Sequence, residues 1–185
     1  MVALALGFNY VPPMRVPFLS LACRAGVGGA CWALADLYSY EKAGSPKDAL
    51  PVLNRGCREL HDQRCCTELV VHTAAGLGTT ADFAAAEKMC MEGDAVWGTG
   101  CLRLGDLTAF NQFGAYDREK RTLAFYRRAC SLGVEQGCQR EKAAAGLLQS
   151  ADDFAQMGAA CAGGDLKACA EVRKAAAPIL PADLR

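Results

Sequence analysis

Apolar side chains recur along the chain with the spacing of an amphipathic α-helix. Ahead of five cysteines they stand seven and four positions upstream, which places them on one helix face. The residues seven positions upstream are Val16, Leu50, Phe83, Leu123 and Phe154. The residues four positions upstream are Leu19, Leu53, Ala86, Tyr126 and Met157. This pattern predicts one recurring helix, which we name helix B.

A second apolar pattern follows helix B and predicts another amphipathic helix, helix A. It reads Cys31-x2-Leu34-Ala35-x2-Tyr38, Cys101-x2-Leu104-Gly105-x2-Thr108 and, without a cysteine, Ala3-x2-Leu6-Gly7-x2-Tyr10. Breaks between helix A and helix B fall at Val11-Pro12-Pro13, Gly44-Ser45-Pro46, Gly76-Leu77-Gly78 and Phe113-Gly114-Ala115. Candidate N-caps of helix B are Ser45 and Asp152. Since no segment alternates with the period of a strand, we predict an all-α fold.

Ten of the eleven cysteines form pairs by spacing. The pairs are Cys23/Cys31, Cys57/Cys65, Cys130/Cys138 and Cys161/Cys169, each eight residues apart, and Cys90/Cys101, with three extra residues. The second cysteines recur with periods of 34, 36, 37 and 31. The periods predict one solenoid domain over residues 1–177, followed by an irregular tail at 178–185. Its approximate repeats are 1–28, 29–63, 64–98, 99–136, 137–166 and a half repeat at 167–177.

The spacing within each pair requires the chain to reverse direction. Residues eight apart on one helix lie about 12 Å apart, whereas a disulfide needs Cα atoms within about 7 Å. A glycine three residues after the first cysteine fits the left-handed position that ends a helix. These glycines are Gly26, Gly93, Gly133 and Gly164, with Leu60 as the exception. We therefore expect each disulfide to join helix B to the next helix A, contributing about 2–3 kcal/mol.

One repeat holds two candidate partners for Cys57. The spacing of eight favours Cys65, whereas the helix A pattern Cys66-x2-Leu69 favours Cys66. Both pairings stay open from the sequence, and one of the two cysteines is left over.

The charge balance excludes some classes of partner. Lys plus Arg and Asp plus Glu number 20 each, so no basic footprint for nucleic acid is expected. No apolar run approaches the roughly 18 residues of a membrane span. Without Cys-x-x-Cys, and with only His61 and His72, we expect neither a metal site nor a cofactor.

Eleven cysteines in 185 residues favour an oxidising compartment, periplasmic or extracellular. A secretory signal would carry a basic segment before its apolar stretch, but Arg15 is the first basic residue. We hypothesise that the chain starts inside a repeat. The alternative is that the cysteines are reduced and act as small apolar residues at helix contacts.

The cysteine pairs around a glycine turn, the Ala-x2-Leu-Gly-x2-Tyr helix and the period near 36 together resemble Sel1-like repeats. Within these repeats, the chain resembles the cysteine-rich subgroup, which is typified by the Helicobacter cysteine-rich proteins. The resemblance implies a right-handed, tetratricopeptide-like α-solenoid that serves as an adaptor or scaffold. Some cysteine-rich members are named as penicillin-binding proteins or β-lactamases, and one mitochondrial member assists cytochrome oxidase assembly. The chain departs from the family in its loops, which lack Gly-x-Gly-Val-x-Lys-Asp.

The exposed face of helix A is the predicted binding groove, because helix A lines the concave side of such stacks. The candidate residues are Trp32, Asp36, Ser39, Thr67, Leu102 and Asp106. An aromatic anchor beside a carboxylate suits a protein or peptide segment. The alternative for Trp32 is packing against a neighbouring helix. We expect a non-catalytic, monomeric scaffold.

The alternative function is that of a β-lactamase-like, penicillin-binding or peptidoglycan-fragment-binding protein. Ser39-Tyr40-Glu41-Lys42 matches the Ser-x-x-Lys motif of penicillin-recognising enzymes, which makes Ser39 and Lys42 weak catalytic candidates. The companion motifs Ser-Asp-Asn and Lys-Thr-Gly do not occur in the sequence. A third hypothesis is a redox-linked assembly factor that uses the unpaired thiol of Cys65 or Cys66.

Overall fold

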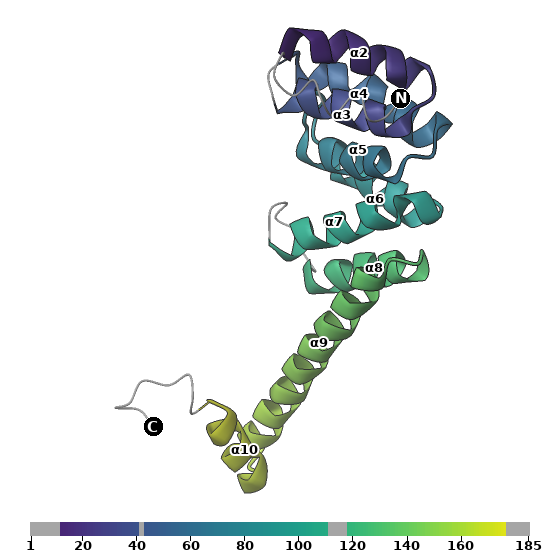
Figure 1. Cartoon of the computed structure of the whole chain (residues 1–185). Coiled ribbons are helices and arrows are strands. Elements are labelled where there is room, and N and C mark those ends of the chain that lie inside the picture. The colour runs from purple at the N-terminus through teal and green to yellow at the C-terminus, as the bar shows by residue number, and fades with distance from the viewer. Residues whose placement is uncertain (1–11, 41–42, 111–117, 177–185) are drawn as a thin grey trace. The chain divides into compact units, whose positions relative to one another are not determined.

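The computed structural model describes residues 12–40, 43–110 and 118–176, and every regular element in these ranges is helical (Figure 1). The α-helices are α2 (Pro12–Arg24), α3 (Gly28–Ser39), α4 (Pro46–Asn54), α5 (Gln63–Ala75), α6 (Phe83–Glu92), α7 (Gly98–Ala109), α8 (Arg118–Ser131), α9 (Glu135–Ala162) and α10 (Leu166–Ala176). A π-helical turn, η1 (Arg55–Glu59), extends α4, and a 3₁₀ turn, η2 (Ala95–Trp97), precedes α7. The predicted all-α class is confirmed.

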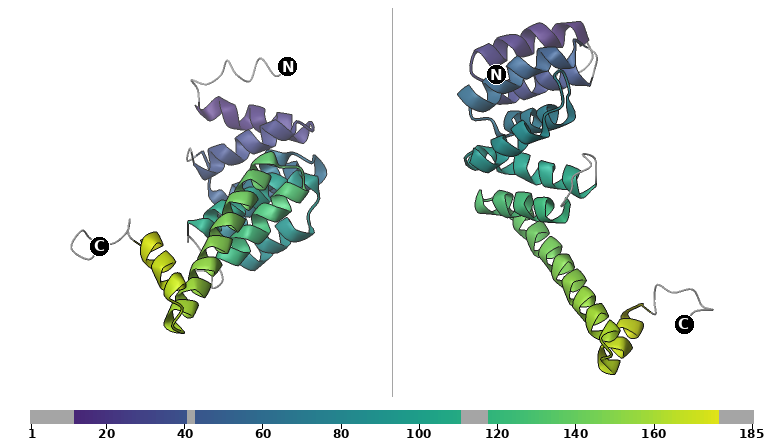
Figure 2. Two further views of the ribbon diagram at one scale, coloured as in Figure 1. Left: turned by 90° about the horizontal axis from the view of Figure 1, so that it is seen from below. Right: turned by 180° about the vertical axis from the view of Figure 1, so that it is seen from behind.

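The predicted alternation of two helix types accounts for the order of the elements. Helix A corresponds to α3, α5 and α7, and helix B corresponds to α2, α4, α6 and α8. Each helix A packs on the helix B before it and the helix B after it, and α5 also contacts α3 and α7 (Figures 1 and 2). These helices therefore form successive antiparallel pairs. The helix A pattern at residues 3–10 lies outside the described residues.

The core of the stack combines cysteines with the predicted apolar stripes. Four positions before a cysteine, Leu53, Ala86 and Tyr126 are all buried. The small residue of helix A permits a close approach, since a Cβ at Gly105 would lie 2.6 Å from the Tyr126 ring of α8. The packing explains why α7 holds Gly105 at this position rather than a larger side chain.

Compact packing divides the chain into two units, Met1–Glu141 and Lys142–Arg185. The pattern predicts a break between helix A and helix B after Cys138, with Asp152 as an N-cap, but α9 is one continuous helix from Glu135 to Ala162. That expectation was wrong because residues 142–151 are rich in helix formers, contain no proline and hold a single glycine, Gly146. The single domain over 1–177 and its repeat bounds stay a prediction.

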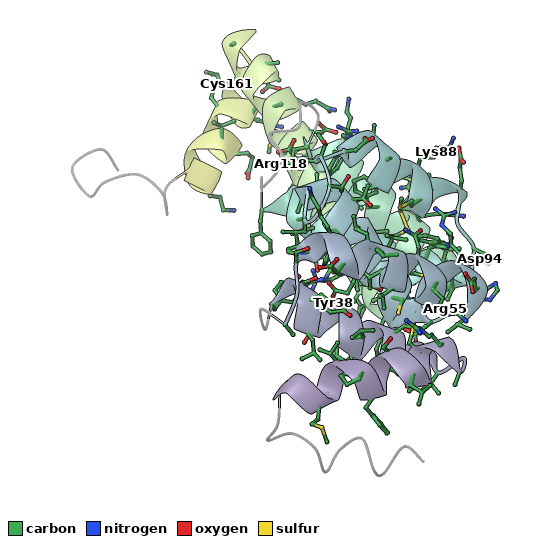
Figure 3. All side chains as sticks on the ribbon, turned by 90° about the horizontal axis from the view of Figure 1, so that it is seen from above. Tyr38, Arg55, Lys88, Asp94, Arg118 and Cys161 are labelled. Carbon is green, nitrogen blue, oxygen red and sulfur yellow. A yellow bond between two sulfur atoms is a disulfide. The ribbon has the colours of Figure 1, made fainter. Side chains whose placement is uncertain are left out.

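Five disulfides connect consecutive helices, with Cα–Cα distances of 4.5 to 5.1 Å; the yellow bonds in Figure 3 mark such sulfur pairs. The bonded pairs are Cys23–Cys31, Cys57–Cys66, Cys90–Cys101, Cys130–Cys138 and Cys161–Cys169. Each bond joins the end of one helix to the start of the next helix. Each therefore spans a chain reversal, as the spacing argument requires.

The reversals use left-handed backbone at most of the predicted positions. Gly26, Gly133 and Gly164 have φ of 92°, 85° and 97°. Gly93 instead has an extended backbone conformation, with a φ of −69°. A left-handed residue is not needed there because the three extra residues of its repeat form η2 and complete the turn. In the repeat without the glycine, His61 takes the positive φ, 53°.

The structure pairs Cys57 with Cys66 and leaves Cys65 as a buried free thiol. Spacing alone favoured Cys65, but a π-helical turn accommodates one residue more than an α-helical turn, and Cys57 lies in η1. The pair is therefore nine residues apart instead of eight. Cys65 packs against Gly56, whose added Cβ would lie 2.8 Å from the Cys65 Cβ.

Within the described ranges, none of the helices combines the length and the hydropathy needed to cross a membrane.

Candidate binding face

Three pairs of side chains face one another across α3 and α5, on the helix A side that the sequence predicts as a groove. We call this surface the α3–α5 face, and it consists of Trp32, Asp36, Ser39, Tyr40, Arg64, Glu68 and His72. The α3 members and the α5 members each recur at helical spacings of three or four residues, so each set forms one stripe along its helix.

The first pair is Trp32 and Arg64. The guanidinium carbon of Arg64 lies 5.3 Å from the centroid of the Trp32 ring, within the range of a cation–π contact. Trp32 is half-buried and packs against the core with part of its ring. The packing interpretation of Trp32 therefore applies to part of its ring, and its role as a binding anchor stays a prediction.

The second pair is Asp36 and Glu68, two carboxylates from successive helices. Burial raises the pKa of Glu68, nearby Arg103 lowers it in part, and the negative charge of Asp36 raises it further. The pKa of Tyr40 is raised by burial and then by Glu68 and Asp36. Since the charge of Asp36 affects both Glu68 and Tyr40, these two groups lie within electrostatic range of Asp36. No ion pair within 4.0 Å engages Asp36 or Glu68 in the described part of the chain.

The third pair is Ser39 and His72. Ser39 Oγ lies 3.3 Å from His72 Nε2, and the Tyr40 ring stands edge-on to the imidazole at 6.4 Å. His72 is only 1% exposed, and burial lowers its pKa, with a smaller opposing effect from the Leu77 backbone. Burial therefore favours the neutral form of the imidazole. Lys42, the other half of the Ser-x-x-Lys match, lies outside the described residues.

Leu102 and Asp106, the second predicted groove pair, lie under other helices instead of at the surface. Leu102 is 4% exposed and Asp106 is 7% exposed. The Tyr126 hydroxyl donates a hydrogen bond of 3.0 Å to Asp106, and Arg140 forms an ion pair with the same carboxylate. The expectation that this pair lines an open groove is corrected, because both side chains are buried and Asp106 is bound by Tyr126 of α8 and Arg140 of α9.

Thr67 is half-buried on α5, and its hydroxyl donates to the Gln63 carbonyl at 2.8 Å. The hydroxyl thus has a partner within its own helix. The other side chains of this face, Tyr40, Arg64, Glu68 and His72, were not among the residues predicted from the sequence. Only a rule that gives the register between neighbouring helices could have identified the three on α5.

The described residues include no cluster of side chains that could coordinate a metal ion. Nowhere in them do three His, Cys, Asp or Glu side chains gather as ligands.

Comparison with known proteins supports the fold through structure. No family model matches the chain, and no curated protein matches it in sequence. Among solved structures, it is similar to the Sel1 repeat protein from Oxalobacter formigenes, with 17% identity and a TM-score of 0.53. The match covers 88% of this chain and 69% of that chain. The chain has the Sel1-repeat fold.

Five disulfides place this Sel1-type stack with the cysteine-rich form of the fold. The similarity to the Sel1 repeat protein identifies an architecture built from stacked helix pairs. A disulfide-linked Sel1 stack also fits an oxidising compartment. The likeness carries no information on catalysis, so the chemistry has to be argued from the α3–α5 face itself.

Proposed function

We propose that the protein is a non-catalytic scaffold that binds a protein or peptide segment on the α3–α5 face. The observation that carries the proposal is the set of three facing pairs, because they present an aromatic ring, carboxylates and a hydroxyl from two helices. Interface anchors are enriched in such aromatic groups at positions held by a rigid support.

The disulfides support this proposal through rigidity. The Cys23–Cys31 and Cys57–Cys66 bonds fix the ends of α2, α3, α4 and α5, the helices in and next to the face. A face held in its binding geometry loses less conformational entropy when a partner docks, so more of the contact energy appears as affinity.

A selection experiment tests the proposal directly. The oxidised protein is used to select binders from a random 12-residue peptide display library, and Kd is measured for the enriched peptides. We expect Trp32→Ala to weaken binding at least tenfold, because it removes the anchor ring. Trp97→Ala is the matched control, since Trp97 also carries an arginine, Arg58, 5.9 Å above its ring but lies in η2. Failure to enrich any peptide, or equal losses in both variants, would rule out this face.

The second candidate is a β-lactam-hydrolysing or peptidoglycan-fragment-binding protein, and the contact between Ser39 and His72 favours it. A serine nucleophile needs a neighbouring base that accepts its proton. The base in turn requires an orienting group, and the described hydrogen bonds of His72 include no carboxylate. Hydrolysis of nitrocefin by the wild type, abolished in Ser39→Ala, would place this function first. Our proposal expects no turnover.

We also propose that the protein works in the periplasm or outside the cell, and as a monomer. The five disulfides support the first statement, because reducing cytosol does not maintain such bonds. Blocking thiols with a membrane-permeant maleimide in intact cells, before lysis, should leave the ten disulfide-bonded cysteines unmodified. Sedimentation at several concentrations should give one species near 19.6 kDa.

A further inference from the structure

A cavity of about 400 Å³ opens among α4, α5, α6 and the segment 79–82 that leads into α6. These three helices follow one another in the stack (Figure 1). Leu50, Leu69 and Met89 form the apolar part of the lining, and Asp82 is the one charged side chain on the described lining. The cavity shares no residue with the α3–α5 face.

The helix A behind this cavity has an equivalent in the next repeat. Leu69 and Thr73 of α5 stand three and seven residues after the bonded cysteine of their helix, as Leu104 and Thr108 of α7 do. Each threonine hydroxyl donates to the carbonyl of the leucine one turn earlier, at 2.8 and 2.7 Å. The space between α4 and α6 therefore corresponds to the space between α6 and α8.

An arginine of the chain itself bridges α6 and α8. Arg121 of α8 forms an ion pair with Glu87 of α6, and its guanidinium carbon lies 4.9 Å from the centroid of the Phe83 ring. The Phe125 ring packs edge-on against the same Phe83 ring, with the centroids 6.1 Å apart. One long basic side chain and one aromatic ring thus occupy the space between these two helices.

Alanines stand at both positions in the preceding repeat. Counted back from the first cysteine of each pair, Arg121 corresponds to Ala81 and Phe125 corresponds to Ala85. Arg121 lies in the first turn of α8, whereas Ala81 precedes the start of α6. Small side chains at these positions leave open a space that an arginine and a phenylalanine occupy one repeat later. This difference accounts for the cavity.

The polar side of the cavity has acceptors available to a cationic group. Asp82 Oδ1 accepts the Ala85 N–H at 2.8 Å and caps α6, but no hydrogen bond or ion pair within the described ranges engages Asp82 Oδ2. The Thr73 hydroxyl gives its proton to the Leu69 carbonyl, so its oxygen can accept a further donor. The apolar lining suits the methylene groups of a long side chain.

Two cations lie near the cavity, and neither forms an ion pair with Asp82 within the described part of the chain. Arg58 donates to Asn54 Oδ1 at 3.1 Å and lies 5.9 Å from the centroid of the Trp97 ring. Lys47 is exposed and lines an adjoining cavity. A guanidinium in direct contact with Asp82 gains a charge-assisted hydrogen bond, whereas water and salt screen its repulsion from exposed cations beyond ion-pair distance.

We infer that this cavity binds an arginine side chain of a partner protein, in the place that Arg121 takes one repeat later. The alkyl part packs along the apolar lining, and the guanidinium donates to Asp82 Oδ2 and to the Thr73 hydroxyl. The site gives the molecule a second point of attachment and does not depend on the function proposed for the α3–α5 face.

A small probe tests this recognition without the rest of a partner. N-acetyl-arginine amide is titrated into the oxidised protein, followed by NMR of the Met89 methyl group and of the Thr80 and Asp82 amides. N-acetyl-citrulline amide has nearly the same shape without the charge and is titrated in parallel. We expect saturable shifts with the arginine amide and about tenfold weaker binding of the citrulline amide, because the charge-assisted bond is lost.

Variants locate the site. Asp82→Asn keeps a good N-cap for α6 and should remove the preference for arginine over citrulline. Asp94→Asn is the matched control, because Asp94 accepts the Val96 N–H at 3.1 Å as the cap of η2 and lies outside the cavity lining; it should bind like the wild type. Asn54→Glu/Ala81→Arg supplies the acid and the arginine of the next repeat and should abolish probe binding.

Equal binding of both amides, an unchanged preference in Asp82→Asn, or undiminished binding in a folded Asn54→Glu/Ala81→Arg would each overturn the inference. Tighter binding of N-acetyl-glutamate amide that is lost in Lys47→Gln would also overturn it, because the cavity would then recognise an anion. Trp32→Ala should leave probe binding unchanged, so failure at this site and failure of the α3–α5 face are distinguishable.

Discussion

Cys65 is the one described cysteine without a disulfide, and its surroundings determine its reactivity. It is fully buried, and burial, followed by the charge of Asp62, raises the pKa of its thiol to about 12. The thiolate is the reactive form of cysteine, so very little of the nucleophile exists at neutral pH. A redox role for this thiol finds no support in such an environment.

We expect Cys65 to resist alkylation in the native state. Iodoacetamide at pH 8 should leave the native protein unmodified for hours, and should add one label per chain after unfolding in guanidinium chloride without a reductant. Mass spectrometry counts the labels. Stoichiometric native labelling within minutes would instead revive the redox-linked assembly hypothesis.

Gly56 makes room for that buried thiol. A Cβ at this position would lie 2.8 Å from the Cβ of Cys65 and 3.1 Å from the Cβ of Cys31. We expect Gly56→Ala to lower the free energy of unfolding by about 1–3 kcal/mol, the usual range for overpacking a core. Denaturation in guanidinium chloride measures the change.

The control for this substitution is Gly29→Ala. Nothing lies within 4 Å of a Cβ at Gly29, which is in the first turn of α3. Alanine there should be neutral or should stabilise by up to about 1 kcal/mol. Partial recovery in Gly56→Ala/Cys65→Ala would confirm that the thiol is the obstacle, and unchanged stability of Gly56→Ala would contradict this view of the packing.

Glu68 should make stability depend on pH in a defined direction. Its pKa is raised above the ordinary 4.5, so between the two values the folded protein binds more protons than the unfolded chain. The unfolding free energy of the wild type should therefore fall as the pH rises through the folded pKa. Below the pKa of Glu68 in the unfolded chain, the carboxyl group is protonated in both states, so it does not destabilise the fold.

Replacing the carboxyl group removes this dependence. Glu68→Gln should become more stable relative to the wild type as the pH rises from about 4 to 7, whereas Glu92→Gln should follow the wild-type curve. Thermal unfolding across this pH range measures the difference. A gap between Glu68→Gln and wild type that narrows with rising pH would contradict the sign.

At the scale of elements, the sequence predicts helix starts where local chemistry decides them. Ser45 was expected as an N-cap and begins α4, with Asp48 accepting hydrogen bonds from its backbone N–H at 2.9 Å and its hydroxyl at 2.8 Å. Asp152 was expected in the same role and lies inside α9. A capping residue cannot stop a helix unless the preceding residues also leave helical geometry, and residues 142–151 contain no strong break.

The second unit depends on its disulfide more than the first unit does. Its described residues are all exposed or half-buried, so α10 has little apolar surface to hold it in place. An isolated helix of 11 residues is marginal in water. The Cys161–Cys169 bond is therefore the main tether between the end of α9 and α10.

We expect Cys161→Ala/Cys169→Ala to accelerate hydrogen exchange over residues 163–176 at least tenfold and to leave exchange in α3, α5 and α7 unchanged. Cys130→Ala/Cys138→Ala is the comparison, because it removes a bond next to the buried Ala129 and should lower the unfolding free energy by about 2–3 kcal/mol. Hydrogen exchange followed by mass spectrometry measures the effect of each double variant. Unchanged exchange in α10 would show that packing alone secures it.

At the scale of the whole molecule, periodicity predicts much of the fold because each repeat uses the same local rules. Cysteine spacing, the apolar stripes and the glycine turns identify helices, reversals and bonded neighbours. Cysteine spacing favoured Cys65 as the partner of Cys57, whereas the structure pairs Cys57 with Cys66. The π-helical turn at Cys57 shifts the register by one residue, and the spacing of the cysteines does not indicate such a turn.

The residues of the α3–α5 face were predicted only in part. Trp32, Asp36 and Ser39 follow from the exposed stripe of one helix, whereas Arg64, Glu68 and His72 depend on how α5 is rotated against α3. Leu102 has the same sequence position as Trp32, but Leu102 is buried whereas Trp32 is half-buried. The repeat pattern assigns equivalent positions; tertiary packing determines which of them stay accessible.

The central claim is that disulfides connect consecutive helices of a Sel1-type stack, with Cys65 left reduced. Intact mass before and after reduction, followed by non-reducing peptide mapping after the free thiol is blocked under denaturing conditions, tests it most directly. We predict that reduction adds ten hydrogen atoms, that Cys57 is linked to Cys66, and that the blocking label is on Cys65. Fewer than five bonds, or a Cys57–Cys65 link, would contradict the account.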